Sequence, residues 1–216
     1  MNGEHLLTKE EQITKLNSRK YIAADPSSCT GCGLCEYVCA LEKSEGTWNI
    51  LMSRIRVVRM HPLLNAAIAC RFCKDARCVT ACPEKALNQS EENGFLTVDE
   101  DKCKGCDWCI QACPHGALAH HPDKTTVIAC DLCGGEPKCV NSCPEEALEL
   151  ISDDTEFENK WRTALQELPN EVERMTEIVK KKEWSNLLAE AEKRALKTSE
   201  KLEEMSNREH SNRKTS

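Results

Sequence analysis

The sequence predicts an α+β fold with a C-terminal helical extension, and three observations support this prediction. Sixteen cysteines in a chain of 216 residues fall into four groups of four. Short stretches of alternating apolar and polar residues, typical of strands, lie between these groups. After residue 151 the cysteines stop, and apolar residues recur at helical spacing. We therefore expect an N-terminal polar segment over residues 1–20, a cysteine-rich domain over 21–151, a helical extension over 152–205 and a disordered tail over 206–216.

The cysteines form a fourfold internal repeat. The first and third groups have the spacing C-x2-C-x2-C-x3-C, whereas the middle gap lengthens to four residues in the second group and to five in the fourth. In chain order the groups are Cys29, Cys32, Cys35 and Cys39; Cys70, Cys73, Cys78 and Cys82; Cys103, Cys106, Cys109 and Cys113; and Cys130, Cys133, Cys139 and Cys143. Proline follows the last cysteine of three groups and leads into a stretch that ends in Ala-Leu, but Ala40 follows in the first group. The alternation of tight and stretched groups indicates a duplicated unit.

Short strands are expected to lead into the cysteine loops. Alternation with a period of two occurs in SRIRVVRM (residues 53–60), in GFLTVDEDKC before the third group and in TTVIACDLC before the fourth. Gly31, Gly33 and Gly105 lie inside the loops, where a chain that wraps closely around a bulky inorganic group needs a positive φ or a residue without a Cβ. An ordinary turn explains each glycine equally well.

Charge and the N-terminal sequence restrict the partners and the compartment. The chain carries 29 basic and 36 acidic residues, and this acidic balance argues against a phosphate-binding surface and therefore against nucleic acid. The N-terminal sequence has no apolar signal core, and no apolar run approaches the roughly 20 residues that span a bilayer. We expect a cytoplasmic protein without direct membrane insertion, unless a bound partner with its own export signal carries it across a membrane.

The cysteine spacing favours iron-sulfur clusters over zinc or disulfides. Disulfide frameworks belong to oxidising compartments and to much shorter secreted chains. Structural zinc takes two pairs of ligands, joined by a loop that lets the chain fold back. In C-x2-C-x2-C three thiolates follow one another along one tight loop, which suits three corners of a cubane cluster better than three ligands of one ion. Four [4Fe-4S] clusters then use all sixteen cysteines, and folding is expected to depend on their insertion.

Apolar residues after position 151 predict two helices. One stripe comprises Phe157, Trp161, Leu165 and Leu168; after a break expected at Pro169, another comprises Val172, Met175 and Val179 and continues through Leu187, Ala191, Ala195, Leu202 and Met205. Trp161 and Trp184 either pack back on the cysteine-rich domain or anchor it on a catalytic subunit or on a second copy of the chain.

Two sets of charged or polar residues near the cysteines have ordinary interpretations. The histidines just past the third group are interpreted as polar residues of a surface loop and not as ligands or a proton relay: His115, His120 and His121. The alternating arginines of one strand face either protect a solvated edge strand, bind an acidic partner or raise the potential of a nearby cluster: Arg54, Arg56 and Arg59.

The cysteine groups and the residues around them resemble the ferredoxin-like four-cluster subunits of anaerobic oxidoreductases. The resemblance covers about residues 21–151 and is carried by DPSSCTGCGLCEYVCALEKSEGTWN, CRFCKDARCVTACPEKAL, DEDKCKGCDWCIQACPHGAL and CDLCGGEPKCVNSCPEEALEL. Such subunits serve molybdenum or tungsten enzymes, formate dehydrogenases, hydrogenases and carbon monoxide dehydrogenases. The resemblance implies two pseudo-symmetric bacterial ferredoxin-like lobes, a duplicated dicluster fold. One lobe combines the first and fourth cysteine groups, and the other combines the second and third over residues 70–118.

The same resemblance implies which cysteines share a cluster. In bacterial ferredoxins the last cysteine of the C-x2-C-x2-C-x3-C-P run ligates the other cluster of a pair. Carried onto this chain, the four ligand sets are Cys29, Cys32, Cys35 and Cys143; Cys130, Cys133, Cys139 and Cys39; Cys70, Cys73, Cys78 and Cys113; and Cys103, Cys106, Cys109 and Cys82.

The function implied is that of a non-catalytic electron-transfer subunit, which relays single electrons between a catalytic oxidoreductase subunit and a second redox partner. The stretch EGTWNILMSRIRVVRMHPLLNAAIACRFC most resembles subunits that accompany tungsten aldehyde oxidoreductases and the hydrogenase or carbon monoxide dehydrogenase ferredoxins. A free soluble polyferredoxin is the alternative, but the cysteine-free helical extension favours a subunit with a docking arm, with self-association through these helices as a further possibility. No catalytic residue is expected, because every thiol is used and no cluster keeps an open iron.

Overall fold

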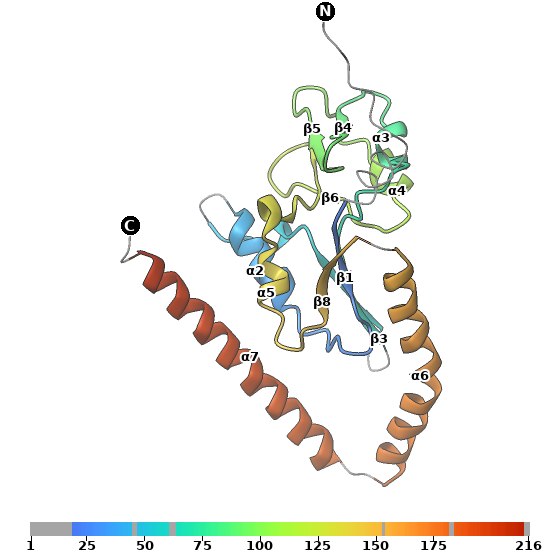
Figure 1. Ribbon diagram of the computed structural model, residues 1–216, viewed down its shortest axis with the longest axis vertical. Helices are drawn as coiled ribbons and strands as arrows, with labels where there is room; N and C mark the ends of the chain where they lie inside the picture. The colour runs from blue at the N-terminus through green and yellow to red at the C-terminus, as the bar shows by residue number, and fades with distance from the viewer. Residues whose placement is uncertain (1–18, 45–46, 61–63, 153, 182–183, 214–216) are drawn as a thin grey trace, which may run out of the picture.

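The computed structural model describes residues 19–44, 47–60, 64–152, 154–181 and 184–213. Most of the expected N-terminal polar segment, residues 1–18, lies outside the described residues. The described chain forms a cysteine-rich domain of short elements, followed by two long helices that extend from it (Figure 1). The expected α+β class is confirmed at this level, with mixed helix and strand and small sheets.

The described strands form four antiparallel sheets of two strands each. The pairs are β1 (Tyr21–Ala24) with β8 (Leu148–Ile151), β2 (Arg56–Met60) with β3 (Leu64–Ile68), β4 (Leu87–Gln89) with β5 (Leu96–Val98), and β6 (Ala119–His120) with β7 (Val127–Ile128). In the first pair Tyr21 lies opposite Ile151 and Ala24 opposite Leu148, so this sheet joins the two ends of the cysteine-rich domain. The strands expected before the third and fourth groups correspond to β5 and β7, and the one expected over residues 53–60 corresponds to β2.

A short helix carries the third cysteine of each group. These helices are α2 (Leu34–Lys43), α3 (Arg77–Thr80), α4 (Trp108–Ala112) and α5 (Lys138–Asn141), with two 3-10 turns, η1 (Ile50–Met52) and η2 (Leu132–Gly135). Helix α2 packs against α5, and α3 packs against α4. The packing therefore brings the first cysteine group beside the fourth and the second beside the third.

The core of the domain is made largely of small residues and cysteines. One buried cluster combines Tyr21, Ile22, Ile55 and Phe72 with the five cysteines Cys35, Cys39, Cys70, Cys130 and Cys139. A smaller cluster surrounds Leu87, Leu118 and Val127 and includes Cys78 and Cys109. Phe72 and Ile55 are the largest apolar side chains that are fully buried among the described residues. Because large apolar side chains are few, much of the interior consists of the surroundings of the thiols.

The helical extension differs from the expectation in where its helices begin and end. Helix α6 (Asp154–Lys181) runs through Pro169, and α7 (Trp184–Arg213) follows, so the expected break at Pro169 is wrong. Proline removes one helical hydrogen bond, but Pro169 is exposed, and water can bond the carbonyl that loses its partner. Helix α7 also continues through residues 206–213, which were expected to belong to a disordered tail. Residues 214–216 lie outside the described residues.

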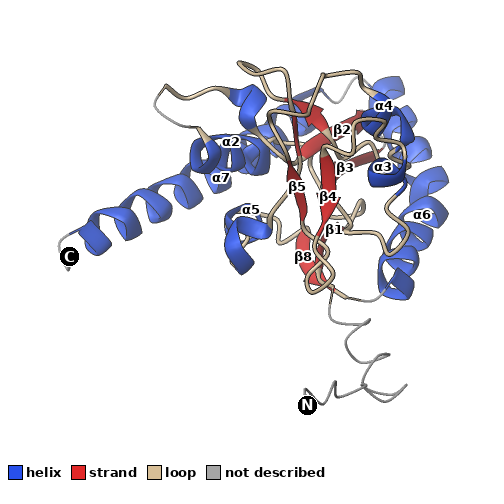
Figure 2. Cartoon of the chain, turned by 90° about the horizontal axis from the view of Figure 1, so that it is seen from above, coloured by secondary structure: helices blue, strands red, loops and turns tan. Residues whose placement is uncertain are grey.

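The two long helices lie on different sides of the cysteine-rich domain. In Figure 1, α6 runs along one side of the cysteine-rich domain and α7 passes along the other, and in Figure 2 the C-terminal part of α7 extends away from the rest of the chain. Phe157 and Trp161 of α6 pack against the main core, whereas α7 is held to the domain by an ion pair from Lys197 to Glu145, 2.9 Å long. Across the described ranges, no helix is both long enough and apolar enough to cross a membrane.

Candidate metal centres

Three cavities in the cysteine-rich domain are each lined by four cysteines. The first is lined by Cys29, Cys32, Cys35 and Cys143; the second by Cys39, Cys130, Cys133 and Cys139; and the third by Cys70, Cys73, Cys78 and Cys113. In each cavity three cysteines come from one group and the fourth comes from the group packed beside it. We refer to these as the first, second and third cavities.

The remaining four cysteines lie in the part of the domain built by the second and third groups. Cys109 is buried in the smaller core, where Cys82 packs against the same cluster. Burial raises the pKa of the Cys109 thiol, and the nearby Cys82 and Cys103 thiols raise it further. Cys106 is exposed at the surface. The structure therefore brings Cys82 of the second group close to cysteines of the third.

The loop between the first two cysteines of each group has the same backbone turn. Two residues after the first cysteine, φ is positive in all four groups, at Gly31, Phe72, Gly105 and Leu132. This turn points a backbone N–H back at the preceding sulfur: the Leu132 amide donates to Cys130 Sγ at 3.4 Å. The positive φ expected for the loop glycines is confirmed. Its occurrence at a phenylalanine and a leucine was not foreseen, because both residue types disfavour this conformation.

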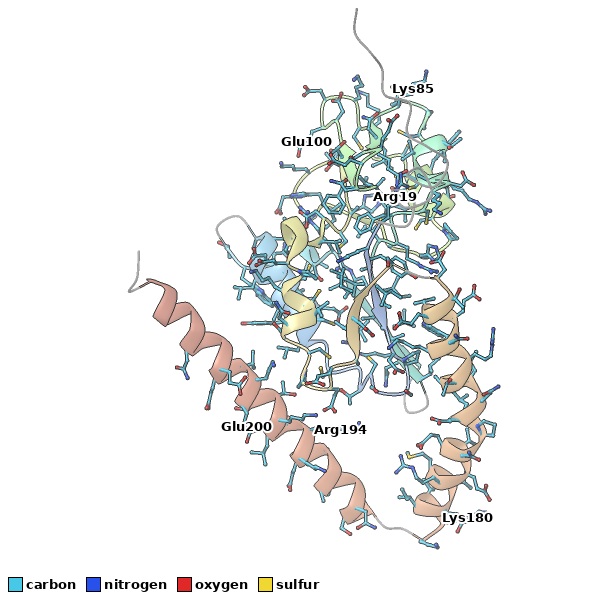
Figure 3. All side chains as sticks on the ribbon, in the orientation of Figure 1. Arg19, Lys85, Glu100, Lys180, Arg194 and Glu200 are labelled. Atoms are coloured by element: carbon cyan, nitrogen blue, oxygen red, sulfur yellow. The ribbon has the colours of Figure 1, made fainter. Side chains whose placement is uncertain are left out.

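A second turn follows the last cysteine in the three groups that contain Cys-Pro. The residue three positions after the cysteine has a positive φ, and the next amide donates to the cysteine sulfur. These bonds run from Ala86 to Cys82 at 3.3 Å, from Ala117 to Cys113 at 3.4 Å and from Ala147 to Cys143 at 3.3 Å. Lys85, at the positive-φ position of the second group, is labelled in Figure 3 at the outer edge of the domain. These alanine amides are functional groups that the sequence reasoning missed, although the repeated Ala-Leu marked their positions.

The first group, which lacks the proline, obtains the same hydrogen bond from elsewhere. Cys39 Sγ accepts a bond from the backbone N–H of Arg54 at 3.1 Å. Arg54 precedes β2 and is distant in sequence, so the missing Cys-Pro turn is replaced by a tertiary contact. Each last cysteine in the described domain therefore has a backbone donor at its sulfur.

The buried thiols carry raised pKa values. Burial raises the pKa of Cys70 and of Cys130 to about 12 and that of Cys78 to about 11, and neighbouring cysteines add to each shift. The pKa values of Cys35 and Cys139 are raised further by burial and by other cysteine thiols. A set of thiolates crowded together in this way requires positive charge among them.

The residues present fit an iron-sulfur cluster. A [4Fe-4S] cluster takes four cysteine thiolates, and its potential depends on hydrogen bonds to sulfur and on burial. Each cavity offers four cysteines around its wall, together with backbone donors at the sulfurs. Within the described ranges no three His, Cys, Asp or Glu side chains are close enough together to bind a single metal ion.

Neighbouring cavities approach one another through pairs of cysteines. The Cys139 thiol of the second cavity raises the pKa of Cys35 in the first, after the larger effect of burial. The Cys130 thiol of the second cavity acts in the same way on Cys70 of the third. The second cavity therefore lies between the first and the third.

Charged side chains near the cavities form ion pairs and hydrogen bonds with other residues of the chain. The three strand arginines each have internal partners: Arg54 pairs with Asp131 at 2.6 Å, Arg59 pairs with Glu36 at 2.8 Å, and Arg56 donates to backbone carbonyl groups, including that of Leu51 at 3.2 Å. Asp131, a residue of the second cavity, also pairs with Lys43 at 3.0 Å.

The three histidines differ in their surroundings. His120 ends strand β6 and pairs with Asp107 at 2.8 Å, so the loop interpretation is wrong for it, whereas His121 follows the strand and accepts a bond from the Asp123 amide at 3.1 Å. His115 instead lines the third cavity, and burial lowers its pKa. Its position directly after Cys113 and Pro114 was the available signal, which the surface-loop interpretation did not use.

The sequence comparisons match iron-sulfur and electron-transport proteins. A family model described as a 4Fe-4S dicluster domain matches residues 63–153. The aliphatic sulfonate oxidoreductase, polyferredoxin-like subunit, of Pyrococcus furiosus is 40% identical over 120 residues, which cover 56% of this chain and 69% of that protein. The electron transport protein HydN of Escherichia coli is 33% identical over 135 residues, covering 53% of this chain and 75% of that protein. Among solved structures, the active site complex BamBC of benzoyl coenzyme A reductase shares 26% identity with a TM-score of 0.37, over 61% of this chain and 78% of that one.

Proposed function

Because this chain belongs to the family of polyferredoxin-like electron transport proteins with 4Fe-4S clusters, we propose that it carries four such clusters and relays single electrons for a catalytic oxidoreductase subunit. It is itself a non-catalytic component, as its relatives are electron transport proteins and polyferredoxin subunits. The observation that carries the proposal is that the cysteines of separate groups line common cavities, four to a cavity. Bound clusters supply the one-electron redox chemistry, and the protein fixes their spacing and tunes their potentials.

The proposed ligand sets pair the first group with the fourth and the second with the third. Three of the sets are those around the first, second and third cavities. The fourth consists of Cys82, Cys103, Cys106 and Cys109; the packing of Cys82 against the buried cluster that contains Cys109, and the electrostatic effect of Cys82 and Cys103 on the Cys109 pKa, support it. The packing of α2 on α5 and of α3 on α4 favours two ferredoxin-like lobes, each with two clusters.

We propose that electrons follow the order of the cavities. The electrostatic effects of Cys139 on Cys35 and of Cys130 on Cys70 support a position of the second cavity in the middle of the described series. The fourth ligand set adjoins the third cavity through the pair of α3 and α4. One end of the route is then near Cys32 and the other near Cys106, and both thiols are exposed. Exposed ends suit exchange with two different partners.

The helical extension is proposed as the contact with the catalytic subunit. Helix α7 turns Lys197 towards the domain and leaves Leu188, Leu196 and Leu202 exposed by 66%, 65% and 39%. Helix α6 likewise exposes Leu165 and Val179 beyond the turns that pack on the core. Exposed apolar stripes of this kind mark interaction surfaces. Trp161 packs back on the domain, whereas the side chain of Trp184 lies outside the described residues.

The identity of the catalytic subunit is a finer part of the proposal. The relative from Pyrococcus furiosus is named as a subunit of an aliphatic sulfonate oxidoreductase, and a tungsten aldehyde oxidoreductase-like partner is proposed from the sequence resemblance. A cytoplasmic location is proposed, where thiols remain reduced. A free polyferredoxin that serves several enzymes is the second candidate. Copurification from native extract separates these: elution near the monomer mass of 24.3 kDa alone would favour the free carrier.

The ligand sets are tested by a pair of serine variants. Cys113→Ser should disturb the cluster of Cys70, Cys73 and Cys78, whereas Cys109→Ser, in the same group, should disturb the cluster of Cys103 and Cys106. Electron paramagnetic resonance (EPR) of the reduced proteins, with iron and sulfide analysis, distinguishes the two. Wild-type protein should contain about sixteen irons per chain, as four four-iron clusters require. Loss of the same signal in both variants would overturn the pairing.

A further inference from the structure

The side chain of Arg71 lies between the third cavity and the first turn of α6. Arg71 follows Cys70 and lines that cavity together with Cys73, Cys78 and Cys113. Its side chain is only 17% exposed. A guanidinium group remains charged at every relevant pH, so this position holds a permanent positive charge beside the cavity. The electron-relay role explains the thiols but assigns nothing to this arginine.

Aromatic rings and hydrogen bonds fix the guanidinium in place. Its central carbon lies 4.7 Å from the centre of the Tyr21 ring and 4.1 Å from that of Phe157. The group also donates to the Tyr21 hydroxyl at 3.0 Å. Cation–π contacts and a bond to a partly buried hydroxyl restrict the rotamers of a side chain that is otherwise flexible. The distance between the charge and the cavity is therefore set by the fold.

Asp154, the first described residue of α6, opposes this charge. Asp154 Oδ1 pairs with Arg71 at 2.5 Å and accepts a bond from the Tyr21 hydroxyl at 2.8 Å. The two side chains carry opposite charges and lie next to each other beside the cavity, so they act on it in opposite directions. Asp154 is 75% exposed, and its contacts with Arg71 and with the Tyr21 hydroxyl hold it near the cavity.

We propose that Arg71 sets the reduction potential of the cluster in the third cavity and that Asp154 moderates this effect, which couples the potential to the position of α6. Reduction adds a negative charge to the cluster, and a fixed positive charge nearby favours it. When α6 is in place, the carboxylate offsets part of the arginine charge. If Asp154 moved away from Arg71, the full arginine charge would act and the cluster would become easier to reduce. This inference rests on the proposed ligand set of the third cavity.

The test is a redox titration of the purified, cluster-loaded protein followed by EPR, with the third-cavity signal identified through Cys113→Ser. Arg71→Gln should lower the midpoint potential of that signal, and Asp154→Asn should raise it. The expected size is about a threefold to tenfold change in the ratio of reduced to oxidised cluster at a fixed applied potential; tenfold corresponds to 59 mV for one electron. Arg71→Lys keeps the charge and should restore most of the potential that Arg71→Gln loses.

A matched control is Arg77→Gln, since Arg77 lines the same cavity but its exposed charge faces the exposed Asp75 at 3.8 Å, whereas Asp154 acts directly on the partly buried Arg71. The midpoint potential of the third-cavity cluster in Arg77→Gln should stay near that of the wild type. Shifts in the same direction for Arg71→Gln and Asp154→Asn, or an equal shift for Arg77→Gln, would overturn the proposal. If Arg71→Gln loses iron, Asp154→Asn still tests the proposal, because an exposed carboxylate can be replaced without unfolding the domain. The midpoint potential of the third-cavity cluster should then still rise in Asp154→Asn. Absence of any 4Fe-4S signal in the wild type would instead refute the proposed function.

Discussion

Replacing Gly31 by alanine should destabilise the first cavity strongly. Gly31 has φ +72° between Cys29 and Cys32, and an added Cβ would lie 2.8 Å from the Cγ and Oδ1 atoms of Asn65. Asn65 belongs to β3 and is 8% exposed, so its side chain has little room to move away. The left-handed conformation costs an alanine about 1–2 kcal/mol. The steric overlap adds about 1–3 kcal/mol, as for other overpacked interiors.

Gly116→Ala is the matched control, because it should lose only the free energy of the left-handed conformation and cause no steric overlap. Gly116 has φ +61° in the turn after Cys113, and nothing lies within 4 Å of an added Cβ. Anaerobic urea unfolding, followed by far-ultraviolet circular dichroism and by the visible absorption of the clusters, compares the two. A difference of about 2 kcal/mol in the free energy of unfolding corresponds to about 1 M urea when m is about 2 kcal/mol/M. Equal midpoints for the two variants would refute the steric reasoning.

Three further predictions concern the other cavities. Phe72→Ala should lower the free energy of unfolding by about 3–5 kcal/mol, because the ring is 1% exposed and stacks 5.0 Å from Phe95; a loss below about 1 kcal/mol in urea unfolding would contradict its role in the core. Cluster insertion at pH 7 should release protons from the ligand thiols, including Cys70, whose pKa burial raises to about 12, so iron binding should tighten as pH rises; a pH-stat measurement that finds no proton release would rule this out. Asp131→Asn should raise the potential of the second-cavity cluster, because Arg54 loses its counter-charge, while the free energy of unfolding changes by less than about 1 kcal/mol; an unchanged or lower potential in a redox titration would count against it.

The chemistry of this protein could be predicted from the sequence more fully than its geometry. The spacing of the cysteines determines which loops can present three thiols to one cluster. The [4Fe-4S] cluster type could therefore be predicted from the spacing. The positive φ at Gly31 was foreseeable because glycine marks such positions. At Phe72 and Leu132 the same turn is imposed by the loop and by burial of the side chain, and no local sequence preference announces it.

The features that could not be predicted from the sequence depend on contacts between residues far apart in the chain. The Arg54 amide reaches the Cys39 sulfur across 15 residues of chain, and a backbone donor has no side-chain signature. The interaction of Arg71 with Asp154 joins residues 83 apart. The helix break at Pro169 was wrong because proline's effect depends on whether water can reach the freed carbonyl, which is a property of the tertiary structure.

The pairing of β1 with β8 brings the two ends of the cysteine-rich domain together. Residues opposite each other in an antiparallel pair lie only about 4.5–5.5 Å apart, so the chain enters the domain at Tyr21 and leaves it at Ile151 side by side. A domain whose ends meet can be placed within a longer polypeptide, or have its ends joined and a new opening cut elsewhere, without separating the thiols that share a cavity. Gene fusion could therefore reuse this part of the protein as a ready-made unit.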